Sequence, residues 1–150
     1  MMSDLNLPAY PFKVIKEDKK TKIFDEIRRE FFVLTPEEWV RQHFVRFLID
    51  HKGYPKGLIA LEKGLTLHGM QKRMDILVYD RFGKPLLIVE CKAPNISVDQ
   101  AVFEQVGRYN ISMKLPYLIV SNGMVHYCAK IDHQQSKIEF LKAIPNYENL

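Results

Sequence analysis

The sequence predicts a mixed α/β fold in which one central mixed sheet is flanked by helices. Two observations predict it. Runs of β-branched and aliphatic residues alternate with two segments of helical periodicity, in the order αβββαββ after an N-terminal β extension. No repeat, linker or low-complexity stretch interrupts this order over the 150 residues. We therefore expect a single domain over residues 1–150, with its core at about 35–131.

The first third of the chain is expected to contain two strands and a long helix. The candidate strands cover Phe12–Glu17 and roughly Lys22–Ile27, and the second could equally be a short helix. The long helix begins at Thr35, where a proline follows at the first helical position and Glu38 completes a Thr-x-x-Glu capping box. Apolar residues recur at helical spacing until Gly53, which ends the pattern.

The middle of the chain is expected to form three strands. One strand covers Leu58–Leu61 and Leu65–Leu67, with a break at Gly64. Two hydrophobic runs, Met74–Tyr79 and Leu86–Lys92, follow it on either side of a cluster of turn residues. Such an arrangement is typical of a strand hairpin.

The last third is expected to contain one helix and several strands. A second capping box, Ser97-x-x-Gln100, opens a helix that continues to about Ser112. The dipeptide Asn122-Gly123 is a strong signal for a two-residue type I′ hairpin turn. The strands expected here are Tyr117–Val120, Met124–Ile131 and Lys137–Leu141.

The composition is that of an ordinary globular protein, with 47% hydrophobic and 27% charged residues. The net charge of +4 permits contact with phosphate groups but does not establish it. Two cysteines, Cys91 and Cys128, are most simply reduced, buried thiols. The N-terminus has no signal-peptide pattern, and no apolar run is long enough to span a membrane. We therefore expect a cytoplasmic protein with no membrane partner.

Charged residues interrupt both strands of the expected hairpin. Pairing Asp80 with Pro85 sets Asp75 directly opposite Glu90, and Lys92 lies two residues further along the same face. Opposed side chains have Cβ atoms roughly 4.5–5.5 Å apart, so two carboxylates there repel one another. A divalent cation would resolve the conflict, since Mg²⁺ takes only one or two protein carboxylates. Ordinary ion pairs at the margin of the sheet explain the pattern about equally well.

A nearby helix face adds to the metal interpretation. Gln105 and Tyr109 are four residues apart in the helix that follows the second strand, so they share one face. A short connection folds that helix back against the strand it leaves and can bring this face near Glu90. A metal ion there would polarise a phosphoryl oxygen and activate a water. Lys92 could orient or deprotonate that water, or stabilise charge developing on the phosphate.

These residues carry a family resemblance. Asp75, the Glu90-Cys91-Lys92 triplet and Gln105-x-x-x-Tyr109 resemble the PD-(D/E)xK nuclease superfamily, in its branch with a Q-x-x-x-Y motif. More closely, four segments look like the N-terminal nuclease domain of type I restriction enzyme R proteins: Thr35–Gln42, Gly53–Pro55, Arg73–Ile76 and Val89–Pro94. The resemblance covers roughly residues 20–130. It departs from the literal motif at Met74, which stands where the name has proline.

The resemblance implies a restriction-endonuclease-like fold and Mg²⁺-dependent cleavage of DNA, with Mn²⁺ as a substitute metal. It assigns Asp75 and Glu90 to the metal and Lys92 to catalysis. It places Gln105 and Tyr109 at the edge of the site, near DNA.

Two further glutamates have two interpretations each. Related nucleases often bring an acidic residue of the first helix towards the metal, which would make Glu38 a ligand. Its place in the capping box already explains Glu38, and this structural interpretation is favoured. Glu62 is similarly expected to be a solvated strand residue rather than a ligand.

Basic residues near the expected site are candidates for contact with DNA. Lys72, Arg73 and Arg41 could bind backbone phosphates, which supply affinity independent of base sequence. A solvated surface is the alternative for each, and Arg73 is the favoured candidate because it lies close to Asp75. The other expected partners are motor or specificity subunits on other chains, because this chain contains no Gly-x-x-x-x-Gly-Lys-Ser/Thr loop.

Three functional hypotheses follow. The leading one is a Mg²⁺-dependent DNA endonuclease-like domain. The second is a non-catalytic module that uses the same fold to bind nucleic acid or a partner protein. The third is an interaction subunit that cuts DNA only together with other chains.

Overall fold

The chain forms two β-sheets and two main helices in a computed structural model that describes residues 2, 4–67 and 69–150. Over these residues, a three-stranded sheet has the order β1-β2-β3 and a six-stranded sheet has the order β4-β5-β6-β7-β8-β9. The N-terminal sheet contains β1 (Val14–Glu17), β2 (Lys20–Asp25) and β3 (Glu30–Val33). The large sheet contains β4 (Ile59–Leu67), β5 (Met70–Tyr79), β6 (Pro85–Cys91), β7 (Tyr117–Ser121), β8 (His126–Asp132) and β9 (Lys137–Leu141).

The large sheet is mixed, as the sequence predicts. Strands β6 and β7 are parallel, whereas the other neighbours in this sheet are antiparallel. A parallel pair needs a crossover connection, which here is the helix α2 (Gln100–Asn110). The other long helix is α1 (Pro36–Lys52), and short 3₁₀ turns cover Lys56–Leu58, Ile111–Met113 and Tyr147–Asn149.

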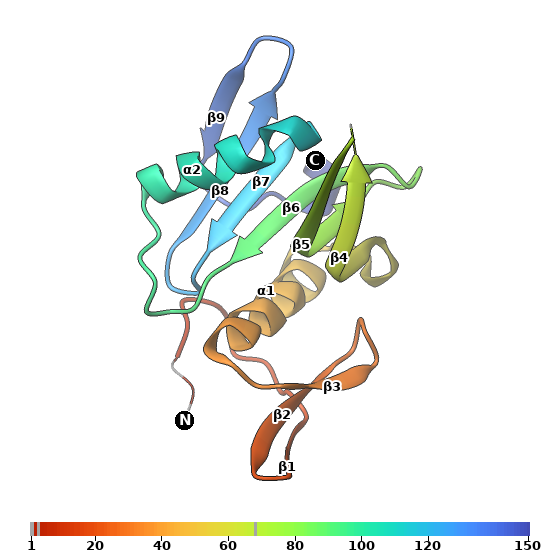
Figure 1. The fold of residues 1–150 in the computed structure, drawn as a ribbon, viewed down its shortest axis with the longest axis vertical. Coiled ribbons are helices and arrows are strands. Elements are labelled where there is room, and N and C mark those ends of the chain that lie inside the picture. The colour runs from red at the N-terminus through yellow and green to blue at the C-terminus, as the bar shows by residue number, and fades with distance from the viewer. Residues whose placement is uncertain (1, 3, 68) are drawn as a thin grey trace.

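The two helices cover opposite faces of the large sheet. Val40, Phe44 and Leu48 of α1 are buried in one core cluster together with Leu87 and Val89 of β6. Phe103 of α2 is buried in a second cluster together with the intervening residue Ile88. Because side chains alternate along a strand, the two clusters lie on opposite sides of β6. Figure 1 shows α2 crossing β7 and β8, with the N-terminal sheet beyond α1 at the other end of the molecule.

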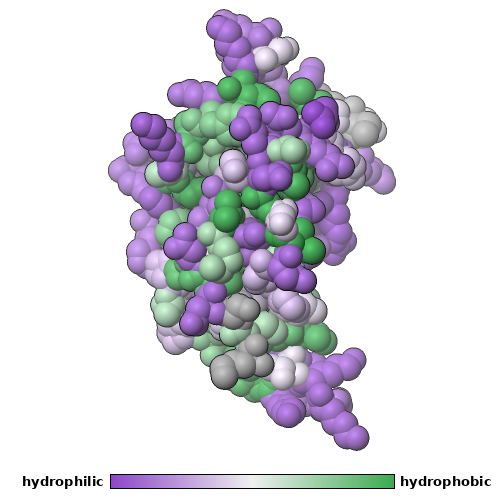
Figure 2. Space-filling model, turned by 90° about the vertical axis from the view of Figure 1, so that its left-hand side faces the viewer, coloured by the Kyte–Doolittle hydropathy of each residue, from purple (hydrophilic) through white to green (hydrophobic). Residues whose placement is uncertain are grey.

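Hydrophilic residues predominate at the two ends of the long axis, with hydrophobic residues interspersed between them (Figure 2). None of the described helices is long and apolar enough to cross a membrane.

Helix α1 begins and ends where the sequence predicts. The Thr35 hydroxyl accepts a hydrogen bond from the Glu38 backbone N–H at 3.0 Å. Gly53 adopts a left-handed conformation with φ of 70° and donates its capping N–H to Leu48. Glycine tolerates this conformation without strain, which explains why the helix ends here.

The central hairpin has the predicted register over most of its length. Ile76 pairs with Val89, Leu77 with Ile88 and Val78 with Leu87, and this offset places Asp75 opposite Glu90. The pairing next to the turn is different, because Tyr79 pairs with Pro85 after a register shift. Asp80 therefore does not pair with Pro85. Its carboxylate instead accepts hydrogen bonds from two backbone N–H groups of the loop, at 2.9 Å each.

The predicted start of the second helix is wrong by two residues. Asp99, not Ser97, is the N-cap of α2, and its carboxylate accepts a hydrogen bond from the Val102 backbone N–H at 2.8 Å. Both residues are good capping residues, so local sequence does not choose between them.

The predicted two-residue turn at Asn122-Gly123 is also wrong. Ser121 pairs with His126, so the loop has four residues and β8 begins later than expected. The Asn122 side-chain oxygen accepts hydrogen bonds from the Met124 and Val125 backbone N–H groups, at 2.9 and 2.8 Å. This side-chain turn replaces the tighter type I′ turn.

The N-terminal region contains more strand than expected. Strand β2 excludes the alternative of a short helix over roughly Lys22–Ile27, and β3 was not predicted from the sequence. Strand β4 continues through Gly64 without a break. Its irregular residue is instead Glu62, whose φ is 51°.

The helix start generates a stability prediction. Asp99→Ala is expected to lower the free energy of unfolding by about 1 kcal/mol, because the N-terminal N–H group loses its acceptor. The matched variant Ser97→Ala should change it by less than about 0.5 kcal/mol, since Ser97 is exposed and lies outside the helix. Urea unfolding measures both values. An equal or larger loss for Ser97→Ala would contradict the assignment.

Candidate active site

Strands β5 and β6 bring together the three residues that the sequence singles out. The Asp75 carboxylate accepts a hydrogen bond from the Cys91 backbone N–H at 2.8 Å, which fixes it against β6. The ammonium of Lys92 lies 3.8 Å from a carboxylate oxygen of Glu90. The predicted juxtaposition is therefore present in the fold. The roles assigned to these residues stay predictions.

The Glu90 carboxyl group carries the electrostatic conflict expected at this point. Burial and, next, the Asp75 carboxylate raise the pKa of Glu90 from its usual 4.5 to about 7, although Lys92 opposes the shift. Lys92 and Arg41 therefore do not fully offset the effects of burial and of Asp75 on Glu90. A further positive charge beside Glu90 would lower its pKa.

The sequence analysis named Arg41 only as a candidate for DNA contact and missed that it organises this site. Arg41 of α1 has only 4% of its side chain exposed, and its guanidinium contacts four carboxylates. We call this group the Arg41 cluster. The distances are 3.1 Å to Glu37, 2.8 Å to Glu38, 2.7 Å to Glu62 and 3.1 Å to Asp75.

The guanidinium of Arg41 stays positively charged in this setting. Burial lowers its pKa, but the carboxylates of Glu38 and Asp75 outweigh this effect and raise the pKa above its usual value. The sequence offered one signal for this role, because Arg41 follows Glu37 and Glu38 at the helical spacings of four and three residues. Contact of Arg41 with DNA phosphates stays a prediction, but the structure gives its guanidinium these other partners.

The Glu38 backbone takes part in the predicted cap, but its carboxylate has partners that neither interpretation named. Its backbone N–H is capped by Thr35 as expected. Its carboxylate, however, points away from the cap and accepts hydrogen bonds from Arg28, Arg41 and Gln42, at 3.1, 2.8 and 3.0 Å. A role as metal ligand stays a prediction, and these donors would compete with the metal for its oxygens.

Glu62 is not the solvated strand residue that the sequence suggested. Its side chain is 27% exposed and lies between two guanidinium groups, those of Arg41 at 2.7 Å and Arg73 at 2.9 Å. A non-glycine residue with positive φ inside a strand is strained, and such strain persists only where surrounding contacts hold it. The two ion pairs supply such contacts.

The two remaining DNA-contact candidates differ in exposure. The Arg73 side chain is 70% exposed and can reach solvent while it pairs with Glu62. Lys72 is buried, and its ammonium lies 3.8 Å from the centre of the Tyr109 ring. Burial lowers the pKa of Lys72. This cation–π contact joins β5 to α2.

The predicted helix face lies beside Glu90 of β6 and beside Lys92, which directly follows that strand. Glu90, Lys92, Gln105 and Tyr109 line one open cavity of about 270 Å³, together with Val102 and Val106. Tyr109 is 69% exposed at its rim. The return of α2 over the sheet therefore brings Gln105 and Tyr109 to Glu90 and Lys92, as the sequence predicts.

The donor set fits a magnesium ion with few protein ligands. Among residues 2, 4–67 and 69–150, no group of three or more His, Cys, Asp or Glu side chains is arranged to hold a metal ion. Mg²⁺ needs only one or two carboxylates and keeps several waters, which suits Asp75 and Glu90. Burial raises the pKa of Glu90 and of Glu37, and the Asp75 charge raises both further, so a cation close to them would favour their ionised forms.

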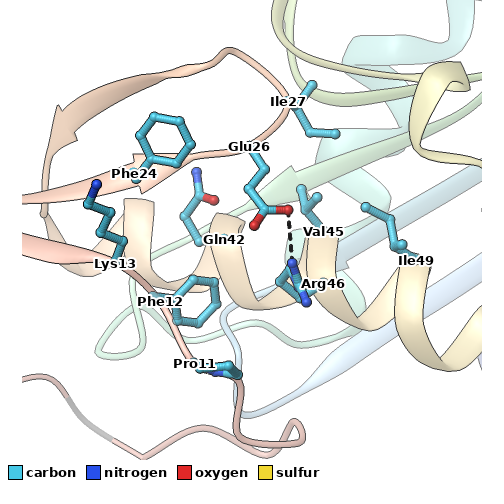
Figure 3. Close-up of a pocket in the computed structure, with 10 residues that line it drawn as sticks. All are labelled: Pro11, Phe12, Lys13, Phe24, Glu26, Ile27, Gln42, Val45, Arg46 and Ile49. Atoms are coloured by element: carbon cyan, nitrogen blue, oxygen red, sulfur yellow. Dashed lines mark hydrogen bonds and ion pairs between the residues drawn. The ribbon is translucent and has the colours of Figure 1, made fainter.

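A second cavity lies on the far side of α1 and contains none of the predicted site residues. Phe12 and Phe24 of the N-terminal region line it, and Glu26 pairs with Arg46 across it at 3.0 Å (Figure 3). This cavity lies between the N-terminal region and α1, and none of the residues that line it belongs to the Arg41 cluster.

Both cysteines, Cys91 and Cys128, are free and buried, as expected.

Comparison with known proteins agrees with the motifs. A family model described as the N terminus of type I restriction enzyme R proteins matches residues 36–145. A fragment described as an HsdR subunit of a type I restriction enzyme from Vibrio vulnificus YJ016 is similar in structure, with a TM-score of 0.53 and 23% identity. The match covers 75% of this chain but only 24% of that one. This likeness shows the fold. Comparison with curated proteins gave no match.

The Glu90 carboxyl group generates a pH-dependent prediction. Its pKa is raised in the folded state, so its contribution to stability is complete below pH 4.5 and is lost as the pH rises through about 7. Glu90→Gln cannot ionise and should therefore be more stable than wild type in chelator at about pH 8, by about 1–3 kcal/mol. The difference should shrink towards pH 4.5. Urea unfolding at several pH values measures it.

The exposed carboxylate of Glu104 on α2 provides the control. Glu104→Gln should change the free energy of unfolding little, both at about pH 8 and towards pH 4.5. If Glu90→Gln loses stability at high pH, Glu90 is not under the electrostatic stress described here.

Proposed function

This chain belongs to the family of type I restriction enzyme R protein N termini, and we propose that it acts as a Mg²⁺-dependent DNA endonuclease domain. The observation that supports this most directly is the placement of Asp75 and Glu90 on two paired strands, with Lys92 directly after the second strand, beside the open cavity that Gln105 and Tyr109 also line. The chain spans about a quarter of the HsdR chain that it resembles, 24%, so the activity of a whole restriction enzyme is not implied.

In this proposal each residue of the site has a separate task. Asp75 and Glu90 would hold Mg²⁺, with Mn²⁺ as a substitute; when bound, the ion would supply Lewis-acid activation of a water and of the scissile phosphate. The Lys92 ammonium lies 3.8 Å from a carboxylate oxygen of Glu90. From there it can orient the water or stabilise charge on the phosphate. The Cys91 N–H and Arg41 hold one oxygen each of Asp75.

DNA is the proposed partner. Arg73 can contact backbone phosphates, and the exposed ring of Tyr109 offers a surface on which an unstacked base can pack. Motor or specificity functions would come from other chains. We further propose that residues 1–150 form one domain and that the protein works in the cytoplasm, where its DNA substrate would be.

A second candidate function is a non-catalytic binding module on the same fold. The observation that favours it is the Arg41 cluster, because a guanidinium already neutralises part of the negative charge that a metal ion would compensate. Such a site could be stable without a metal.

Cleavage assays distinguish the two functions. Purified protein should cut plasmid or single-stranded DNA in the presence of Mg²⁺ or Mn²⁺, and Asp75→Asn and Lys92→Ala should lower the rate by at least about 100-fold. Lys84→Ala, at an exposed lysine of the β5–β6 loop, is the matched control and should cleave at the wild-type rate. Equal cleavage by all four proteins would indicate a contaminant. Binding without cleavage, and without any effect of metal, would favour the module.

The Tyr109 ring generates a separate binding prediction. Tyr109→Ala should weaken binding of single-stranded DNA in chelator by roughly 5-fold to 100-fold, since stacking contributes about 1–3 kcal/mol per base. Tyr109→Phe keeps the ring and should bind like wild type. Fluorescence anisotropy with a labelled oligonucleotide measures both. Equal affinity for the alanine variant would exclude Tyr109 from the DNA interface.

A further inference from the structure

We infer that Arg28 is a positioning residue for Asp75, and that it acts through Glu38 and Arg41. Arg28 lies in the turn between β2 and β3, so the N-terminal sheet would take part in arranging the site. The effect on Asp75 is a property of the metal-free protein. The consequence for cleavage rests on the proposed function.

A continuous series of ion pairs connects this turn to the site. The Arg28 guanidinium donates to both oxygens of Glu38, at 3.1 and 3.2 Å. Glu38 accepts from Arg41 at 2.8 Å, and Arg41 donates to Asp75 at 3.1 Å. Asp75 in turn accepts from the Cys91 N–H at 2.8 Å. Residues from β2–β3, α1, β5 and β6 are thus joined by direct contacts.

The turn that carries Arg28 is built around a fully buried carboxylate. One Asp25 oxygen accepts from the backbone N–H groups of Ile27 and Arg28, at 2.8 and 2.9 Å. The other accepts from Arg28 Nε at 2.6 Å and from Gln42 of α1 at 2.9 Å. Asp25 is 0% exposed. The Arg28 guanidinium also lies 3.5 Å from the centre of the Phe32 ring, so its position is restrained from several sides.

Charge balance explains how Arg28 can affect Asp75 without touching it. Glu38 and Asp75 both bind the Arg41 guanidinium, and both compete for its single positive charge. Arg28 supplies Glu38 with a second positive charge, because its guanidinium donates to both carboxylate oxygens. Without Arg28, Arg41 would be the only cation that the structure places on Glu38, beside the neutral amide of Gln42 at 3.0 Å. Ion pairs in a buried setting are strong enough to move a side chain. Arg41 would then shift towards Glu38 and release Asp75.

This role lies outside the part of the chain that the family model matches. That match begins at residue 36, whereas Asp25 and Arg28 precede it. The N-terminal sheet would therefore supply a contact that the matched region does not contain by itself.

Hydrogen exchange in the metal-free protein provides the first test. In Arg28→Gln, the Cys91 amide should exchange at least about 10-fold faster than in wild type, because its acceptor Asp75 is no longer held. Arg28→Lys restores a charge but not the planar fork, so its rate should lie between the two. The Tyr54 amide, which donates to Leu48 at 3.0 Å, serves as an internal reference for global unfolding and should not change.

A matched control separates positioning from simple docking of the N-terminal sheet. Glu26 follows Asp25 in the same turn and connects it to α1 through Arg46 at 3.0 Å, a pair that shares no residue with the series from Arg28 to Asp75 (Figure 3). Glu26→Gln should therefore leave Cys91 exchange unchanged. Wild-type exchange in Arg28→Gln, or equal acceleration in Glu26→Gln, would overturn the inference. If Arg28→Gln does not fold, the comparison of Arg28→Lys with Glu26→Gln decides it by the same criterion.

Cleavage kinetics provide the second test. Arg28→Gln should lower kcat about 10-fold with KM for DNA unchanged, since Arg28 is remote from the DNA-facing cavity; Glu26→Gln should change neither. An unchanged kcat together with unchanged Cys91 exchange overturns the inference. If wild type does not cleave DNA at all, the proposed function fails, and Cys91 exchange alone decides the role of Arg28.

Discussion

One buried guanidinium shared by four carboxylates is the interaction on which the candidate site depends. Arg41 reaches from α1 to the neighbouring β4 and β5 strands, where it binds Glu62 and Asp75. Burying these carboxylates without a counter-charge would cost several kcal/mol for each ion. The position of α1 on the sheet and the geometry of the site are therefore set by the same contact, as well as by apolar packing.

This constraint explains features that look unrelated when considered one at a time. Glu62 keeps a strained backbone because two guanidinium groups hold its side chain. Glu38 leaves its reciprocal role in the helix cap and turns towards Arg28 and Arg41. Buried ion pairs add little net stability, but they penalise arrangements that leave one charge unpaired. Here they favour a single arrangement of the carboxylates around Arg41.

Much of the fold was predictable because it follows from local chemistry. Thr35 and Gly53 determine the ends of α1, and the alternation of apolar residues determines most of the β5–β6 register. The errors occurred where two neighbouring residues could serve the same purpose. Asp99 rather than Ser97 caps α2, and the Asn122 side chain lengthens the following turn. Such choices differ by only about 1 kcal/mol, so packing decides them.

The sequence by itself determined the family, the fold class and the opposition of Asp75 and Glu90. These depend on motifs and on strand periodicity, which act over short distances along the chain. Only the tertiary structure decided which charges compensate them. Arg28 and Arg41 meet the site through contacts between residues far apart in sequence, and Arg41 and Asp75 are separated by 34 positions. No periodic pattern encodes such a contact, because it exists only after α1 and the N-terminal sheet have packed.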